Sequence, residues 1–85
     1  MKQSAYLTDM TDDAYILDAT GLLCPLPVLK ARKRLQRLSK GECLTVLADD
    51  PAAIVDVPHF CAESGHRLVS SALDGQQQTY VIEKT

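Results

Sequence analysis

Apolar residues in the first half of the chain change from the spacing of a strand to the spacing of a helix. The run 14–18, Ala-Tyr-Ile-Leu-Asp, has the β-branched and aromatic character of a short strand. After Pro27, apolar residues recur every three or four positions, at Val28, Ala31, Leu35 and Leu38, with Leu29 widening the stripe. This period predicts an amphipathic helix, and Gly41 is the residue expected to end it.

A second helical pattern begins near residue 50. Asp50 followed by Pro51 is typical of a helix start, with the aspartate as N-cap and the proline at the first helical position. The expected apolar stripe is Ile54, Val57 and Cys61. Pro58 lies inside this segment, so we expect a bend near Asp56 between a short first turn and better-formed later turns. Gly65 is expected to end the helix.

Three further runs predict strands. The first, residues 43–48, lies between the two helices. The other two, 67–73 and 79–84, are joined by Asp74-Gly75, which is typical of a hairpin turn, and the glutamines at 76–78 make the predicted turn longer. The predicted order is β-α-β-α-β-β. A helix between two strands usually makes a right-handed crossover, and a hairpin pairs its strands antiparallel. We therefore expect an α/β fold with a mixed four-stranded sheet and two helices on one face.

Composition limits the classes of function. With 85 residues the chain has room for one domain, which we place at 14–85, after a polar, acidic stretch at 1–13 that reads as a flexible tail. Neither a signal sequence nor an apolar run of about 18 residues is visible, so we expect a cytoplasmic protein without a membrane span. The net charge of −2 and the absence of tryptophan argue against direct binding of nucleic acid.

The three cysteines are the candidates for chemistry. Cys24, Cys43 and Cys61 form no C-x-x-C pair, and their spacing fits no zinc framework, so no metal site is predicted. Cys43 lies in a predicted strand and Cys61 on an apolar helical stripe, where a free cysteine packs as a small hydrophobic residue. Cys24 is then the candidate for a working thiol.

Cys24 stands where a loop becomes a helix, so we expect it to be the N-cap of that helix. The partial positive charge at a helix start favours a thiolate over a thiol. Pro25 and Pro27 have no amide hydrogen, which leaves Leu26 as the first amide able to reach the sulfur. No histidine or carboxylate is adjacent in sequence, which gives no support to a Cys-His hydrolase, although Asp18 or His66 can be brought close by folding.

Most of the basic residues lie on the helix that begins at Cys24. Four of them fall on one side and are predicted to form a docking face: Lys30, Lys33, Arg34 and Arg37. Lys30 is six residues from Cys24, about 9 Å along the axis, which is too far for a solvated charge to tune the thiol strongly. The alternative is that this face is only solvated surface.

Four segments in order resemble the TusA (SirA-like) sulfur-carrier family, whose signature is a C-P-x-P turn. They are 17–27 (LDATGLLCPLP), 48–52 (ADDPA), 56–61 (DVPHFC) and 65–69 (GHRLV). The resemblance implies a two-layer α/β sandwich that carries sulfur as a persulfide on Cys24, with Pro25, Leu26 and Pro27 as the supporting turn. It implies a PLP-dependent cysteine desulfurase as donor, a downstream relay protein as acceptor, and no cofactor of its own.

The resemblance leaves the pathway open. The best-known branch of the family serves 2-thiouridine synthesis in tRNA, and other branches serve molybdenum-cofactor maturation or sulfur oxidation. By the same resemblance, Asp49, Asp50 and the segment 56–60 with Phe60 belong to partner surfaces, although capping and core packing explain them equally well. Leu23 stands where several relatives have a polar or basic residue. The alternatives to a sulfur carrier are a thiol-redox module and a regulatory binding domain in which Cys24 is only a cap.

Overall fold

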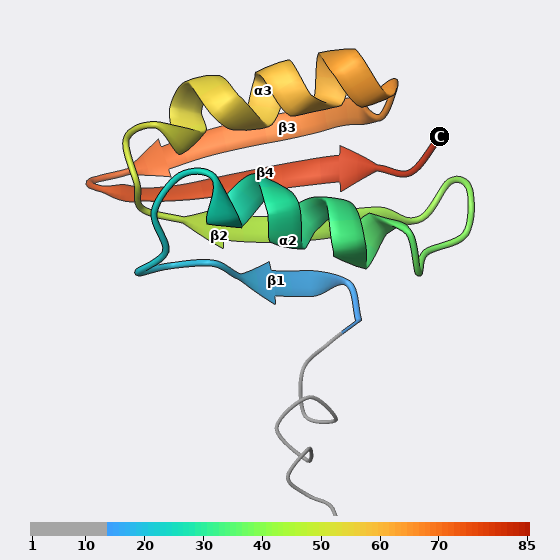
Figure 1. Cartoon of the computed structure of the whole chain (residues 1–85), viewed down its shortest axis with the longest axis horizontal. Coiled ribbons are helices and arrows are strands. Elements are labelled where there is room, and N and C mark those ends of the chain that lie inside the picture. The colour runs from blue at the N-terminus through green and yellow to red at the C-terminus, as the bar shows by residue number, and fades with distance from the viewer. Residues whose placement is uncertain (1–13) are drawn as a thin grey trace, which may run out of the picture.

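Six elements follow one another in the predicted order β-α-β-α-β-β in a computed structural model that describes residues 14–85 (Figure 1). They are β1 (Ile16–Asp18), α2 (Leu26–Leu35), β2 (Cys43–Ala48), α3 (Ala53–Ser64), β3 (Arg67–Asp74) and β4 (Gln77–Glu83). The tail predicted at residues 1–13 lies outside the described residues. Over the described part of the chain, no helix is long and apolar enough to cross a membrane.

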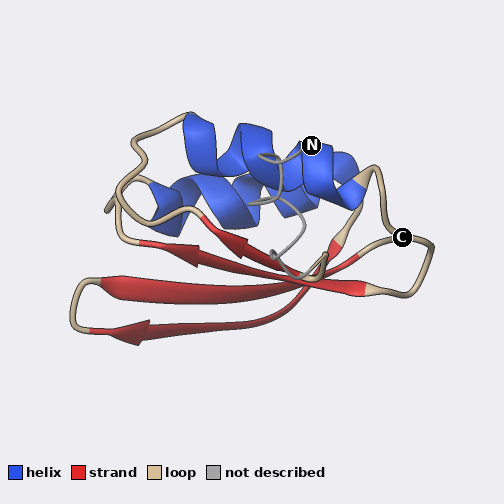
Figure 2. Ribbon diagram, turned by 90° about the horizontal axis from the view of Figure 1, so that it is seen from below, coloured by secondary structure: helices blue, strands red, loops and turns tan. Residues whose placement is uncertain are grey.

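The four strands form one mixed sheet in the order β1-β2-β4-β3. β1 and β2 are parallel, whereas β4 runs antiparallel to both β2 and β3. The chain passes through α3 from β2 to β3 and then returns through the hairpin, so that β4 fills the space between them. Both helices cover the same face of the sheet (Figure 2), as the sequence predicts.

The core lies between the helices and alternate residues of the two central strands. Leu44, Val46 and Ala48 of β2 and Tyr80 and Ile82 of β4 are buried toward the helices, which is the two-residue period of a sheet with one covered face. The helices contribute Ala31 and Leu35 from α2 and Ala53, Val57, Phe60 and Cys61 from α3.

Two predicted core positions are wrong. Leu29 and Ile54 are each 48% exposed, because the stripe of each helix that faces the sheet is narrower than the apolar pattern suggested. In α3 the core position is taken by Phe60, which is 5% exposed and belongs to the same helical face as Val57.

Helix α2 ends at Leu35, earlier than the predicted stop at Gly41. After Leu35 the helix gives way to a tighter turn, in which the amide of Leu38 donates to the carbonyl of Leu35. The side chain of Leu38 is buried in the core. The Lys84 ammonium donates to the carbonyl oxygens of Leu35 and Leu38 at 2.6 and 3.2 Å, so a cation satisfies the negative end of the helix. Gly41, at φ +93°, serves the turn into β2 instead.

Helix α3 runs without interruption across Pro58, from Ala53 to Ser64, and the predicted bend near Asp56 stays a prediction. A proline removes one backbone hydrogen bond, but α3 has buried residues before Pro58, at Val57, and after it, at Phe60 and Cys61, and these hold both parts of the helix against the sheet. The Asp50 side chain accepts a hydrogen bond from the amide of Ala52, as a cap does, although the regular helix begins after a tight turn, at Ala53. Gly65 ends the helix at φ +82°, as predicted.

The hairpin between β3 and β4 is tighter than predicted. Asp74 pairs with Gln77, so only Gly75 and Gln76 form the turn, and Gln77 and Gln78 belong to β4. Gln78 is 2% exposed. Its amide nitrogen donates to the Asp50 carbonyl and its oxygen accepts from the Tyr80 hydroxyl, which satisfies both ends of a buried polar side chain.

Candidate functional site

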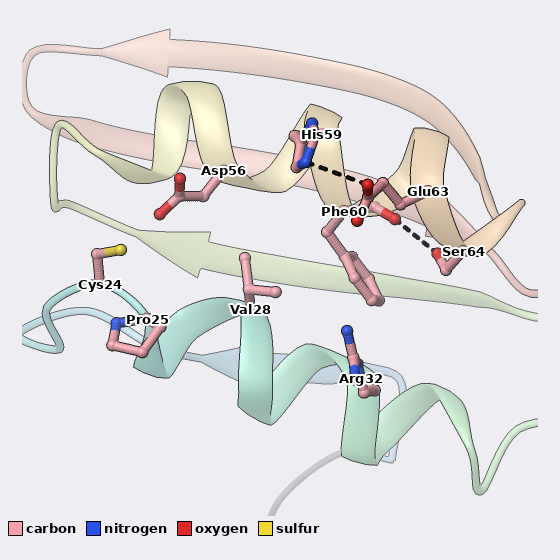
Figure 3. A pocket seen from close by; sticks show the side chains of 9 residues that line it. All are labelled: Cys24, Pro25, Val28, Arg32, Asp56, His59, Phe60, Glu63 and Ser64. Carbon is pink, nitrogen blue, oxygen red and sulfur yellow. Dashed lines mark hydrogen bonds and ion pairs between the residues drawn. The ribbon is translucent and has the colours of Figure 1, made fainter.

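Cys24 lies at the end of the loop between β1 and α2, with its side chain exposed. It stands at one end of a groove of about 400 Å³ between α2 and α3 (Figure 3). The groove is lined by Cys24, Pro25, Val28, Arg32, Asp56, His59, Phe60, Glu63 and Ser64. The sulfur is therefore reachable from solvent beside a surface that can receive part of another molecule.

The start of α2 differs from the prediction by one residue. Pro25 occupies the cap position, the regular helix begins at Leu26, and the bond between Cys24 and Pro25 is cis. The amide of Leu26 donates to the carbonyl of Leu23 at 2.8 Å. Cys24 is thus not the N-cap, and the amide that was expected to reach its sulfur is already used.

Two neighbouring aspartates hold the loop that carries Cys24. The amide of Cys24 donates to Asp50 Oδ2 at 2.6 Å, and the amide of Gly21 donates to Asp49 Oδ1 at 2.9 Å. The other oxygen of the Asp50 carboxylate accepts from the amide of Ala52 at 3.2 Å, so one side chain ties the β1–α2 loop to the start of α3. Both aspartates are half-buried, and each holds the loop by accepting a hydrogen bond from one of its backbone amides.

The carboxylate of Asp56 faces the thiol from the first turn of α3, and Figure 3 shows both groups at the same end of the groove. The hydrogen bond between Cys24 and Asp56 raises the pKa of the thiol, followed by partial desolvation and by the negative charges of Asp56 and Asp50. The expected shift toward thiolate is wrong. A full charge at hydrogen-bond distance outweighs the partial charge of a helix start from which two prolines have removed amide donors.

Asp56 is the neighbour of the thiol that sequence reasoning did not identify. The two groups that folding could have brought close to Cys24 have other partners: Asp18 accepts hydrogen bonds from Thr20, and the His66 ring lies tilted to the Phe60 ring, with 6.0 Å between the ring centroids. The signal available in the sequence was the acidic residue in the first turn of a helix. Only the packing of α3 beside α2 shows which group it meets.

The four predicted docking residues separate into two groups. Lys30 and Lys33 on α2, and Arg37 just after its end, are exposed. Arg34 is half-buried and donates to the carbonyl of Ile16 at 3.0 Å, which fastens the helix to β1. Arg32, which the docking prediction omitted, lines the groove with its guanidinium 5.6 Å from the centre of the Phe60 ring.

The other cysteines differ from each other in their surroundings. Cys61 is 3% exposed in the core, as predicted, and burial raises the pKa of its thiol. Cys43 is exposed at the start of β2, on the face of the sheet opposite the helices, so the prediction that it packs as a core residue is wrong. Within residues 14–85, no group of three His, Cys, Asp or Glu side chains is arranged to hold a metal ion.

Comparisons with known proteins agree in fold and family. The model of the family "Sulfurtransferase TusA" matches residues 15–84. The crystal structure of a SirA-like protein from Desulfitobacterium hafniense superposes with a TM-score of 0.71 and 27% sequence identity. The match covers 80% of this chain and 93% of that one, so the likeness extends over nearly the whole related protein.

The bond from Cys24 to Asp50 predicts a specific effect of Asp50→Ala. Without the carboxylate, the amides of Cys24 and Ala52 lose their acceptor, and we expect both to exchange with deuterium about tenfold faster. Amide-resolved hydrogen exchange by NMR measures this. Asp49→Ala is the matched control and should expose only the amide of Gly21. Unchanged exchange at Cys24 in Asp50→Ala would show that the bond does not hold the loop.

The contact with Asp56 predicts that Asp56→Asn makes Cys24 more reactive at neutral pH. Removing the negative charge lowers the raised pKa of the thiol, so the thiolate fraction increases. Because a weaker base is also a weaker nucleophile, we expect the alkylation rate to rise about threefold for each pKa unit lost.

Peptide mass spectrometry after timed iodoacetamide treatment from pH 6 to 10 separates Cys24 from Cys43. The pH profile of Cys24 should move to lower pH in Asp56→Asn and stay in place in Glu63→Gln, a change elsewhere in the same groove. Equal profiles in Asp56→Asn and the unaltered protein would remove Asp56 from the site.

Proposed function

The chain belongs to the TusA sulfurtransferase family, and on that premise we propose that Cys24 carries sulfur as a persulfide from one protein to another. The observation that carries the proposal is an exposed thiol at the end of a groove, with space beside it for part of another protein. Transfer between proteins needs an approachable sulfur, because in each step a thiolate of the receiving protein attacks the terminal sulfur of the persulfide on the other protein.

Loading begins with a persulfide on the donor, which we propose to be a cysteine desulfurase. Cys24 first loses its proton to solvent, and the resulting thiolate attacks the terminal sulfur of the donor persulfide. A sulfur–sulfur bond forms on Cys24, the donor's sulfur–sulfur bond breaks, and the donor cysteine leaves as a thiolate. No net oxidation occurs, because the sulfane sulfur is only exchanged between two thiols. The PLP chemistry that generates the persulfide belongs to the donor.

Delivery reverses these roles. A thiolate of the acceptor, which we propose to be a downstream relay protein, attacks the terminal sulfur on Cys24. The sulfur–sulfur bond on Cys24 breaks, and Sγ leaves as a thiolate that takes up a proton from solvent. In the absence of a partner, the raised pKa of Cys24 keeps the thiol protonated and less open to stray oxidation.

The turn after Cys24 supports this role by its rigidity. Pro27 is fully buried and anchors the start of α2, whereas Leu26 is 43% exposed and Leu23 is 69% exposed. Exposed apolar side chains of this size on either side of the sulfur offer a contact surface that a partner can desolvate. We propose that they are the apolar part of the docking site and that Pro25, Leu26 and Pro27 fix the direction of the sulfur.

Exposed basic residues on and just after α2 supply the charged part of the proposed docking site. Lys30 and Lys33 on the helix, and Arg37 after its end, favour an acidic surface on the partner. Rim charges of this kind chiefly set the rate and orientation of encounter. Asp49 and Asp50 are already bonded to backbone amides, so we assign their influence on transfer to the loop that they hold.

The proposal predicts that Cys24→Ser abolishes sulfur loading. Incubation with a cysteine desulfurase, PLP and free cysteine should add the mass of sulfur to the intact protein, as measured by mass spectrometry. Cys43→Ser and Cys61→Ser should load fully, and Cys43→Ser is the more informative control because Cys43 is also exposed. Full loading of Cys24→Ser would reject the site. Glutathione mixed disulfide on Cys24 without persulfide would favour a thiol-redox module.

We propose 2-thiouridine synthesis in tRNA, in the cytoplasm, as the pathway that receives the sulfur. Deletion of the gene in its own organism should then remove 2-thiouridine from tRNA, as measured by mass spectrometry of nucleosides, because the relay loses one carrier. The intact gene should restore the nucleoside, whereas Cys24→Ser should not. Normal thiolation with loss of molybdoenzyme activity, or of sulfur oxidation, would assign the carrier to one of those pathways instead.

A further inference from the structure

Strand β3 forms one edge of the sheet, and no strand among residues 14–85 pairs with its outer side. Over its eight residues, only Leu68 is half-buried and the others are exposed, including Val69 at 44% and Leu73 at 62%. Figure 2 shows the turn end of the β3–β4 hairpin lying away from the helix layer. A long exposed edge with apolar side chains is a template for pairing with another strand.

The sequence of β3 is nearly complementary to itself when it is read in the opposite direction. The strand is Arg-Leu-Val-Ser-Ser-Ala-Leu-Asp, from Arg67 to Asp74. In an antiparallel pair of two such strands, the basic first residue lies opposite the acidic last residue, and Leu68 lies opposite Leu73. Cross-strand pairs of opposite charge and of apolar side chains each stabilise a sheet.

An irregularity at Val69 puts these residues on matching faces. Leu68 pairs with buried Ile82, but the next paired residue is Ser70 rather than Val69, so the alternation shifts by one position. The paired residues of β3 on the helix side of the sheet are therefore Leu68, Ser71 and Leu73, and those on the open side are Arg67, Ser70, Ala72 and Asp74. Without this bulge, Arg67 and Asp74 would lie on opposite faces.

We propose that β3 pairs with β3 of a second copy of this chain, antiparallel and about a two-fold axis at Ser71. Residues opposite each other in an antiparallel pair share a face, and the bulge makes every pair obey that condition. Each pair joins a residue of one copy to a residue of the other: Arg67 with Asp74, Leu68 with Leu73, Ser70 with Ala72, and Ser71 with the Ser71 of the second copy. The result is one continuous eight-stranded sheet with the helices of both copies on the same side.

The charges and the apolar surface both favour this occupant. Arg67 already lies 3.3 Å from Glu83 on the adjacent strand, and Asp74 of the second copy would extend this row of alternating charge on the open face. On the helix side, Leu73 lines a small groove of about 210 Å³ with Ile54 and Pro58 of α3. Pairing brings Leu68 of the second copy beside Leu73 and covers part of that groove.

The proposed dimer leaves the thiol site open. Helix α2 lies over β1 and β2, and α3 stands between it and the β3 edge (Figure 1). The inference thus does not depend on sulfur transfer. An interface of one strand pair belongs to the small, weak class of interfaces, so the dimer should form and dissociate with concentration.

The two-fold axis provides a sharp test with Ser71→Cys. Opposite residues at the axis have Cα atoms about 4.5 to 5.5 Å apart, within the range that a disulfide spans. In a background of Cys24→Ser and Cys43→Ser, mild oxidation with diamide should convert Ser71→Cys to a covalent dimer, as seen by non-reducing electrophoresis. Ser70→Cys is the matched control, since its two copies lie about 8 Å apart. Equal cross-linking of the two variants would overturn this register.

Charge reversal tests the ends of the pair in the unmodified background. Sedimentation of the full chain from 10 µM to 1 mM, roughly the range for a weak interface, should show a monomer–dimer equilibrium. Arg67→Asp or Asp74→Arg alone should weaken it about tenfold or more, and the double variant should restore it. A monomer throughout that range, or a dimer unaffected by either reversal, would overturn the proposal. Restoration in the double variant also separates lost pairing from lost folding.

Discussion

The geometry of the site depends on the hydrogen bonds accepted by Asp50. One oxygen of its side chain accepts from the amide of Cys24, and the other accepts from the amide of Ala52. The backbone carbonyl of Asp50 accepts from the buried side-chain amide of Gln78. These contacts join the β1–α2 loop, the start of α3 and strand β4. Because the carboxylate is half-buried and satisfied on both oxygens, it holds the loop at a fixed distance from α3. That distance brings the thiol to Asp56.

The surroundings of Cys24 suit a carrier better than a self-activated nucleophile. A helix start by itself favours thiolate, but here the nearest charges are carboxylates, and they raise the pKa of the thiol. A protonated sulfur reacts slowly with small molecules. On the proposed function, selectivity therefore comes from docking and not from intrinsic reactivity.

Local patterns predicted the elements, and long-range contacts decided what the patterns left open. The period of apolar residues and the glycine at 65 predicted β2, the end of α3 and the element order, because these depend on neighbours in the chain. The carbonyl of Leu35 at the end of α2 is capped by Lys84, 49 residues further along the chain. The raised pKa of Cys24 depends chiefly on Asp56 in another helix. Neither contact leaves a periodic trace in the sequence.

The shape of the site also limits how partners can use it on the proposed function. Cys24 carries a single sulfur at one end of one groove, so donor and acceptor cannot contact that sulfur at the same time. The donor must leave before the acceptor binds, and a long-lived complex with either would stop the transfer. Exposed cations on α2 fit this requirement, because screened rim charges speed encounter while adding little to the lifetime of a complex. A small apolar contact at Leu23 and Leu26 then aligns the sulfur without holding the partner for long.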